Sequence, residues 1–129
     1  MGSFRYRVEI ASPQGQTFEA LDALVDTGAT YTWVPRPLLE KLGITPAFKR
    51  EFLLADGRTI QRDVAQVIAR IDGQSLYTLC IFGDEGSEPL LGMVTLEEFG
   101  LGVDPVNRRL IPVPGFLTTG SSQGLGFES

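Results

Sequence analysis

The sequence predicts an all-β domain, closed or sandwich-like, with one or two short helices. Three observations support this fold class. Apolar and polar residues alternate over several short segments, turn-forming Gly, Pro and Asp residues separate these segments, and only two brief stretches have helical spacing. A length of 129 residues with 43% hydrophobic residues suits one domain with a modest core. We therefore expect a single folded unit at residues 1–113.

The first half of the chain is expected to contain three strands and one short helix. Apolar and charged residues alternate from Phe4 to Ile10, which is typical of a half-buried strand. Pro35 and Pro37 favour the start of a helix, and Gly43 favours its end. We expect strands at residues 4–10, 17–25 and 29–34, and a helix at residues 38–42.

Two Asp-Gly pairs mark hairpin turns in the second half of the chain. Asp56-Gly57 and Asp72-Gly73 each separate two segments with strand character, which is a strong hairpin signal. We expect strands at residues 51–54, 59–71, 76–82, 90–92, 101–104 and 109–113, an acidic loop at 83–89, and a helix at 93–99. From residue 114 the chain is rich in Gly, Ser and Thr, which predicts a flexible tail at 114–129.

The composition excludes several kinds of chemistry. The chain has no histidine, which removes Ser-His-Asp triads and His-ligated metals. Cys80 is the only cysteine and lies in an apolar run, so we expect a buried thiol, and a reducing compartment such as the cytoplasm fits. The net charge of −5 argues against a nucleic-acid partner, and no apolar run is long enough to span a membrane. Carboxylates, hydroxyls and backbone amides remain as catalytic groups, and we expect neither a metal nor a cofactor.

Asp26-Thr27-Gly28 is the most informative motif of the chain. It follows an apolar strand segment, and a carboxylate at the end of a buried strand, on a glycine turn, is costly to place there. Asp-Thr-Gly also suits an ordinary turn, which is the alternative interpretation of Asp26. A second segment, Leu90-Leu91-Gly92, leads into the helical pattern at 93–99.

Together these two motifs resemble the retropepsin-like, or retroviral-type, family of single-domain aspartic proteases. The resemblance covers roughly residues 4–113 and, outside the two motifs, is one of pattern. It implies a closed, β-barrel-like acid protease fold with a flap hairpin, and an endopeptidase that uses no cofactor or metal. It also implies a C2 homodimer, because the chain carries one Asp-Thr-Gly where the chemistry needs two carboxylates.

The resemblance assigns roles to the residues of the first motif. Asp26 of each chain forms the catalytic dyad, Thr27 braces the two loops against each other, and Gly28 permits close approach of a peptide substrate. Ala29 stands where pepsin-like enzymes often carry Ser, so the pair lacks a hydroxyl donor and activity is expected at mildly acidic pH. Thr27 has an alternative interpretation as an ordinary β-branched strand residue.

The resemblance also implies which residues contact the substrate. The hairpin at residues 51–63 matches the flap in order and spacing, although a plain surface hairpin is the alternative. Leu90 and Trp33 either line a pocket or belong to the core. The substrate-binding set that we expect is Ala29, Thr30, Trp33, Ala55, Asp56, Gly57, Arg58 and Leu90.

Two positions depart from the family pattern. Retroviral members commonly carry an aspartate directly after the position of Ala29 and an arginine directly after that of Gly92, and these side chains bond each other near the dimer interface. Here the two residues are Thr30 and Met93, so this ion pair is missing.

Two other functions remain open. The chain is alternatively a dimerisation or peptide-binding module of the same fold with little or no hydrolysis, because a fold does not fix a function. A carboxylate–metal hydrolase using Asp26 with Asp56 or Asp84 is a second alternative, which the spacing of these residues does not support.

Overall fold

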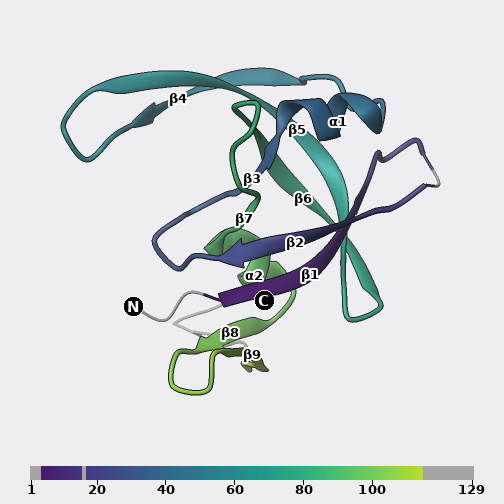
Figure 1. The fold of residues 1–129 in the computed structure, drawn as a ribbon, viewed down its shortest axis with the longest axis vertical. Coiled ribbons are helices and arrows are strands. Elements are labelled where there is room, and N and C mark those ends of the chain that lie inside the picture. Colours follow the sequence, from purple (N-terminus) through teal and green to yellow (C-terminus); the bar gives the residue numbers. More distant parts are fainter. Residues whose placement is uncertain (1–3, 16, 115–129) are drawn as a thin grey trace, which may run out of the picture.

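A computed structural model describes residues 4–15 and 17–114, and most of these residues lie in strands (Figure 1). The strands are β1 (Phe4–Ala11), β2 (Glu19–Val25), β3 (Thr32–Pro35), β4 (Phe48–Leu53), β5 (Thr59–Ile71), β6 (Gln74–Gly83), β7 (Leu90–Leu91), β8 (Leu101–Asp104) and β9 (Arg109–Pro112). The helices α1 (Arg36–Lys41) and α2 (Met93–Glu98) have six residues each. Neither helix within the described ranges is long and apolar enough to cross a membrane.

The main sheet closes on itself. Its seven strands follow the order β1-β2-β7-β3-β6-β5-β4, and β1 also pairs with β5, so six of them form a ring and β4 lies outside it on the edge of β5. β8 and β9 form a separate two-stranded sheet. This arrangement confirms the predicted all-β, closed, barrel-like fold with two short helices. For the site the central pairings matter, because β7 lies between β2 and β3 and pairs with both.

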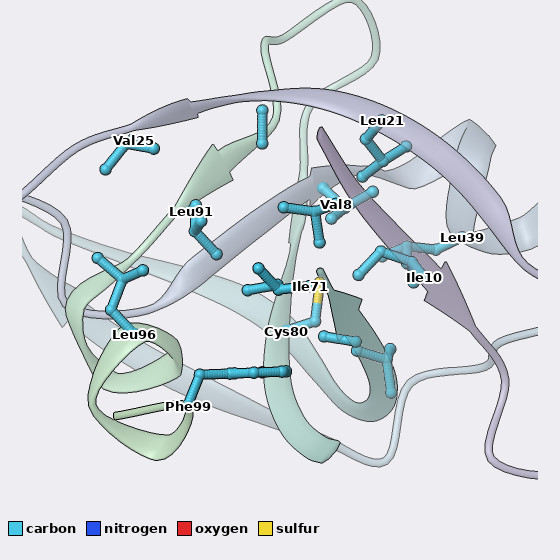
Figure 2. Close-up of a cluster of buried hydrophobic side chains, with 14 of the residues drawn as sticks. Val8, Ile10, Leu21, Val25, Leu39, Ile71, Cys80, Leu91, Leu96 and Phe99 are labelled. Atoms are coloured by element: carbon cyan, nitrogen blue, oxygen red, sulfur yellow. The ribbon is translucent and has the colours of Figure 1, made fainter. Parts of the chain in front are cut away.

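The core fills the inside of the ring (Figure 2). Alternate residues of β1, β2 and β5 are buried, as the twofold side-chain period of a strand requires, and most of the buried residues of the ring are apolar. The helices add Leu39 from α1 and Leu96 from α2, both fully buried. Cys80 lies in the same cluster, as predicted, and burial raises the pKa of its thiol to about 12. A labelled part of the core in Figure 2 consists of Val8, Ile10, Leu21, Val25, Leu39, Ile71, Cys80, Leu91, Leu96 and Phe99.

The turns follow the chemistry predicted for them. Asp72 and Gly73 both adopt positive φ, at 51° and 85°, and join β5 to β6 with Ile71 opposite Gln74. Such a two-residue turn favours Gly, which has no Cβ, and Asp, whose short polar side chain allows the left-handed region. Gly43 ends α1 at a φ of 76°, again as expected.

Several predicted boundaries were wrong. The third strand begins at Thr32 rather than residue 29, because the carbonyl oxygens of Ala29 and Thr30 accept hydrogen bonds from α2 instead of a strand. The strand expected from Thr17 begins at Glu19, and the strand expected from Glu51 begins at Phe48. Residues 48–50 are all exposed, so this part of the strand lacks the alternation of apolar and polar residues that marks a half-buried strand in a sequence. The tail predicted at 114–129 lies outside the described residues, except for Pro114.

Candidate active site

Asp26 directly follows β2 and is held by the backbone of a strand that lies much later in the chain. Leu24 and Val25 pair in parallel with Leu90 and Leu91 of β7, and the amide of Asp26 donates to the carbonyl oxygen of Leu91 at 3.2 Å. The Asp26 side chain is half-buried, and its Oδ1 accepts a hydrogen bond from the amide of Gly28 at 2.9 Å. The amide of Ala29 closes the turn on the Asp26 carbonyl oxygen at 3.0 Å. The carboxylate is therefore fixed in position at the end of a buried strand.

The other half of this loop is held by α2. The amides of Met93 and Val94 donate to the carbonyl oxygens of Ala29 and Thr30, both at 2.9 Å. These are amides of the first helical turn, which have no partner inside a helix and must find one elsewhere. The carbonyl oxygens of the loop and the first amides of the helix thus provide each other with hydrogen-bond partners. The two positions that lack the retroviral ion pair thus bond their neighbours through the main chain, Met93 to Ala29 and Thr30 to Val94.

Gly92 lets the helix approach the loop closely. A Cβ at this position would lie 2.4 Å from both the carbonyl carbon and the carbonyl oxygen of Tyr31, which is a backbone clash. The Gly92 amide also donates to Oγ1 of Thr32 at 3.1 Å. The sequence analysis noted Gly92 as part of a motif but did not place it in the site. The sequence feature that could have placed Gly92 in the site is a glycine at the junction of a buried strand and a helix.

Three buried threonines connect the loop to the core. Thr95 Oγ1 lies 2.7 Å from Thr32 Oγ1 and 2.9 Å from Thr78 Oγ1, so the three hydroxyls form one hydrogen-bonded chain from β3 through α2 to β6. All three residues are buried. Buried hydroxyls need partners, and here they supply one another. Sequence reasoning missed this chain because a threonine in a strand looks like any other β-branched residue.

Thr27 and Gly28 form the exposed tip of the Asp26 loop. A Cβ on Gly28 would lie 3.2 Å from Oδ1 of Asp26, closer than an ordinary van der Waals contact. Among the described residues the side chain of Thr27 has no hydrogen-bond partner. Its hydroxyl is available to a molecule outside this chain.

Trp33 and Leu90 lie together beside the loop. They face each other across the antiparallel pair of β3 and β7, and Leu90 also pairs with Leu24 of β2. Both side chains are half-buried. They therefore belong neither wholly to the core nor wholly to the surface.

The β4–β5 hairpin projects from the ring (Figure 1), and its tip is the predicted turn at residues 55–58. Gly57 has a φ of 90°, and the Leu54 amide donates to the Arg58 carbonyl oxygen at 2.7 Å. The Asp56 carboxylate accepts from the amide of Arg58 at 3.0 Å and from its Nε at 2.7 Å. These hydrogen bonds lower the pKa of Asp56 below its usual value. The tip residues are exposed and bond one another rather than the Asp26 loop.

The hairpin reaches the site through residues that the sequence analysis did not select. The centre of the Phe52 ring lies 6.1 Å from that of Tyr31, in the edge-on arrangement that aromatic pairs prefer, and 5.9 Å from that of Trp33, in a tilted arrangement. Nη1 of Arg50 donates to Oη of Tyr31 at 3.2 Å. These residues could have been found from the period of two in a strand, which places Phe48, Arg50 and Phe52 on one face.

The other acidic residues considered with Asp26 lie elsewhere. Asp56 is bonded to Arg58 at the hairpin tip, and Asp84 pairs with Arg62 at 3.4 Å. Within residues 4–15 and 17–114, no group of three or more acidic or cysteine side chains is placed to hold a metal ion.

Comparison with known proteins identifies the family. A family model described as an aspartyl protease matches residues 8–95, which is more than half of the chain, so the chain belongs to the aspartyl protease family. A search among curated proteins gave no match. The matched region contains the Asp26 loop, the hairpin, β7 and the start of α2.

Solved structures of retroviral proteases share the fold. The solution structure of the Simian Foamy Virus (mac) protease matches with a TM-score of 0.53 and 23% identity, over 74% of this chain and 94% of that one. The EIAV protease complexed with the inhibitor HBY-793 matches with a TM-score of 0.60 and 18% identity, over 78% of this chain and 91% of that one. The fold is therefore retropepsin-like, as the two sequence motifs predicted, and family and fold together indicate a protease-type function.

Proposed function

We propose that this chain is an aspartic endopeptidase that hydrolyses peptide bonds as a C2 homodimer, with one Asp26 from each protomer. The observation that carries the proposal is a single half-buried Asp26 whose main chain is fixed by Leu91 and, through Ala29, by Met93. Only one Asp-Thr-Gly is present per chain. A twofold axis beside this loop supplies the second carboxylate, because an isologous interface places each residue opposite its own copy.

The two carboxylates would share one proton. The ionised Asp26 accepts a proton from the attacking water, and the protonated Asp26 donates one to the carbonyl oxygen of the scissile peptide bond. Two like charges so close together do not both ionise readily, so the pair takes up protons in two separated steps. A rigid loop suits this chemistry, since the mutual position of the carboxyl groups decides whether they share a proton.

Exposed groups around the loop support a second protomer. The hydroxyl of Thr27 has no partner among the described residues, and it lies next to the carboxylate. Leu53, beside the hairpin tip, is 75% exposed and is available to a partner or a substrate. In the proposed dimer Thr27 bonds the partner loop, and the hairpins close over an extended peptide that adds strand-like hydrogen bonds.

The test is cleavage of a peptide library read by mass spectrometry, with the wild-type protein beside two variants. Asp26→Asn is expected to abolish cleavage without loss of the fold. Asp22→Asn changes an exposed aspartate of β2 and is the matched control, which is expected to cleave normally. Full activity of Asp26→Asn would refute the mechanism. Peptide binding without cleavage by the wild type would instead favour the binding module.

Mixing the two proteins tests the shared dyad. A tenfold excess of Asp26→Asn over wild type converts most wild-type chains into mixed dimers, which hold only one of the two aspartates. Activity per wild-type chain should then fall severalfold, and adding Asp22→Asn instead should have no such effect. Unchanged activity in the mixture would show that one chain is sufficient.

A further inference from the structure

The face of the β4–β5 hairpin that is turned toward Tyr31 and Trp33 carries two arginines directly across from each other. Arg50 of β4 is the register partner of Arg62 of β5. Directly opposed residues of an antiparallel pair point to the same face of the sheet. Because Phe52 and Arg50 contact Tyr31, this face is the one that looks toward the strand following the Asp26 loop. We call it the inner face, and it consists of Phe48, Arg50, Phe52, Ile60, Arg62 and Val64.

Two like charges opposite each other destabilise a strand pair, so this arrangement needs a reason. Arg50 donates to the Tyr31 hydroxyl and lies 5.0 Å from the centre of the Phe48 ring, but it forms no ion pair with any described carboxylate. Both of these partners are uncharged. The Arg50 guanidinium therefore keeps an unneutralised positive charge beside aromatic surface.

Arg62 is only weakly neutralised. Its Nη2 reaches Oδ2 of Asp84 at 3.4 Å, near the limit of a hydrogen bond, and the Asp84 side chain is 76% exposed. The Nε of Arg62 is buried and has no partner among the described residues, which is unfavourable for a charged donor.

The opposite face of the same hairpin shows the contrast. There Asp63 accepts hydrogen bonds from both Lys49 and Arg36, so these cations share a carboxylate. The excess of positive charge is thus confined to the inner face. The chain as a whole has a net charge of −5, so an attraction for acidic groups at this face would be a local property and not a general one.

We propose that Arg50 and Arg62 form a subsite that selects an aspartate or glutamate side chain of the substrate, and this rests on the proposed peptidase function. Guanidinium groups bind carboxylates through charge-assisted hydrogen bonds, and here Arg50 bonds only the uncharged Tyr31, while Arg62 bonds the Gln61 carbonyl oxygen and, at 3.4 Å, Asp84. An incoming carboxylate would supply the missing negative charge between the two arginines. The substrate class is therefore an extended peptide that combines an apolar residue with a nearby acidic one.

The spacing along the strand fixes where the acidic residue should lie. Arg50 and Phe52 are two residues apart on β4, which corresponds to about 7 Å along the strand. An extended peptide beside the hairpin has the same repeat, so its side chains on one face are also two residues apart. When an apolar side chain contacts Phe52 and Trp33, the side chain two positions away faces Arg50. The side chain that faces Arg50 lies farther from the hairpin tip than the apolar side chain does.

The test uses the best-cleaved peptide of the library, with each position replaced in turn by Glu, Gln and Lys. For wild type, we expect one peptide position, two residues away from an apolar residue, at which the Glu peptide has a kcat/KM about tenfold higher than the Gln peptide. Arg50→Gln and Arg62→Gln should each reduce this ratio toward one, and Arg50→Glu should reverse the preference in favour of Lys. Arg7→Gln, an exposed arginine of β1, should keep the wild-type ratio. Circular dichroism of each variant checks the fold.

A binding measurement separates this proposal from the peptidase function. Fluorescence anisotropy with Asp26→Asn compares the labelled Glu, Gln and Lys peptides without any hydrolysis. If wild type cleaves nothing, the peptidase proposal fails, yet tighter binding of the Glu peptide that is lost with Arg50→Gln still supports the subsite. Equal affinity for the Glu and Gln peptides, or a preference that survives both arginine substitutions, overturns it.

Discussion

The side-chain oxygens of Thr32 and Thr95 lie 2.7 Å apart in the buried space between β3 and α2. Thr32 comes six residues after Asp26, and Thr95 belongs to the helix whose first amides bind the Asp26 loop. The same Thr32 oxygen accepts the Gly92 amide, so one hydroxyl joins loop, strand and helix. Protein stability and the position of the carboxylate consequently depend on the same few polar groups.

Replacement of Thr95 by valine tests this connection. Valine keeps the shape of threonine but removes the hydroxyl, which leaves Thr32 and Thr78 without that partner. The free energy of unfolding, measured with urea, should fall by about 1–3 kcal/mol because buried hydroxyl groups lose hydrogen bonds. Thr95→Ser is the control, since it keeps the hydroxyl and loses only a methyl group, at about 1 kcal/mol. A valine variant more stable than the serine variant would contradict the prediction.

Gly92→Ala should weaken both the fold and the activity. The added methyl would meet the Tyr31 main chain at 2.4 Å, and only movement of α2 away from the Asp26 loop relieves the clash. Overpacking of this kind typically costs about 1–3 kcal/mol of unfolding free energy. Gly15→Ala is the milder comparison, because a Cβ there would lie 3.3 Å from the Cβ of Ser12, which is a tight contact rather than a backbone clash. Activity and stability equal to wild type in Gly92→Ala would show that the close approach is not needed.

Ala29→Ser should move the pH–activity profile to lower pH. One ionised and one protonated carboxyl are required, which gives a bell-shaped profile of kcat/KM for the dyad as a pair. A serine hydroxyl next to the loop would stabilise the ionised form, so the active state would persist at higher acidity. The measurement is kcat/KM from pH 3 to 8 on one peptide (roughly the range in which carboxyl groups and their coupled pairs titrate). A shift to higher pH, or none, would show that position 29 does not face the dyad.

Asp63 should contribute to the acid sensitivity of the fold. Hydrogen bonds from Lys49 and Arg36 hold the pKa of Asp63 below its usual value. A carboxyl group whose pKa is lower in the folded state stabilises the fold when it is ionised. This stabilisation is fully present above the ordinary carboxyl pKa of about 4 and is lost as the pH falls through the pKa of the folded state. The unfolding free energy of wild type should therefore exceed that of Asp63→Asn at neutral pH, and the two should converge in acid. Urea unfolding at a series of pH values measures this difference.

Substitution of Lys49, which binds Asp63, provides the control for that experiment. Lys49→Gln removes one of the two cations that bind Asp63 and should reduce the pH dependence without abolishing it. A difference between wild type and Asp63→Asn that stays constant down to the most acidic pH would exclude a role for this carboxylate in acid unfolding.

Local signals in the sequence predicted much of the fold. The Asp72-Gly73 turn, the glycine that ends α1, and the alternation of residues 4–10 each depend on neighbours in the chain, and such features are readable from sequence. The position of Asp26 after a buried strand was equally local. The closed sheet followed from the resemblance to a known family rather than from the pattern itself.

The features that were missed depend on contacts between distant segments. The third strand starts late because residues 29 and 30 bond α2, more than sixty residues away in sequence. Arg50 and Arg62 face each other only because of the register of the hairpin, and Phe52 meets Trp33 only because the hairpin folds over β3. Register is set by the hydrophobic pattern and the turn geometry, and the mostly exposed residues of β4 show little of that pattern, so neither pair was selected in advance.

The parallel pairing of β2 with β7 affects the order in which a newly made chain can become active. A ribosome releases Asp26 long before Leu91 and Met93, and until those residues emerge the amide of Asp26 and the carbonyl oxygens of the loop lack their protein partners. The hairpin, by contrast, pairs neighbouring segments, so its two strands are both available for pairing soon after they are made. In the proposed peptidase, a half-synthesised chain would therefore lack an organised carboxylate until β7 and α2 have been made.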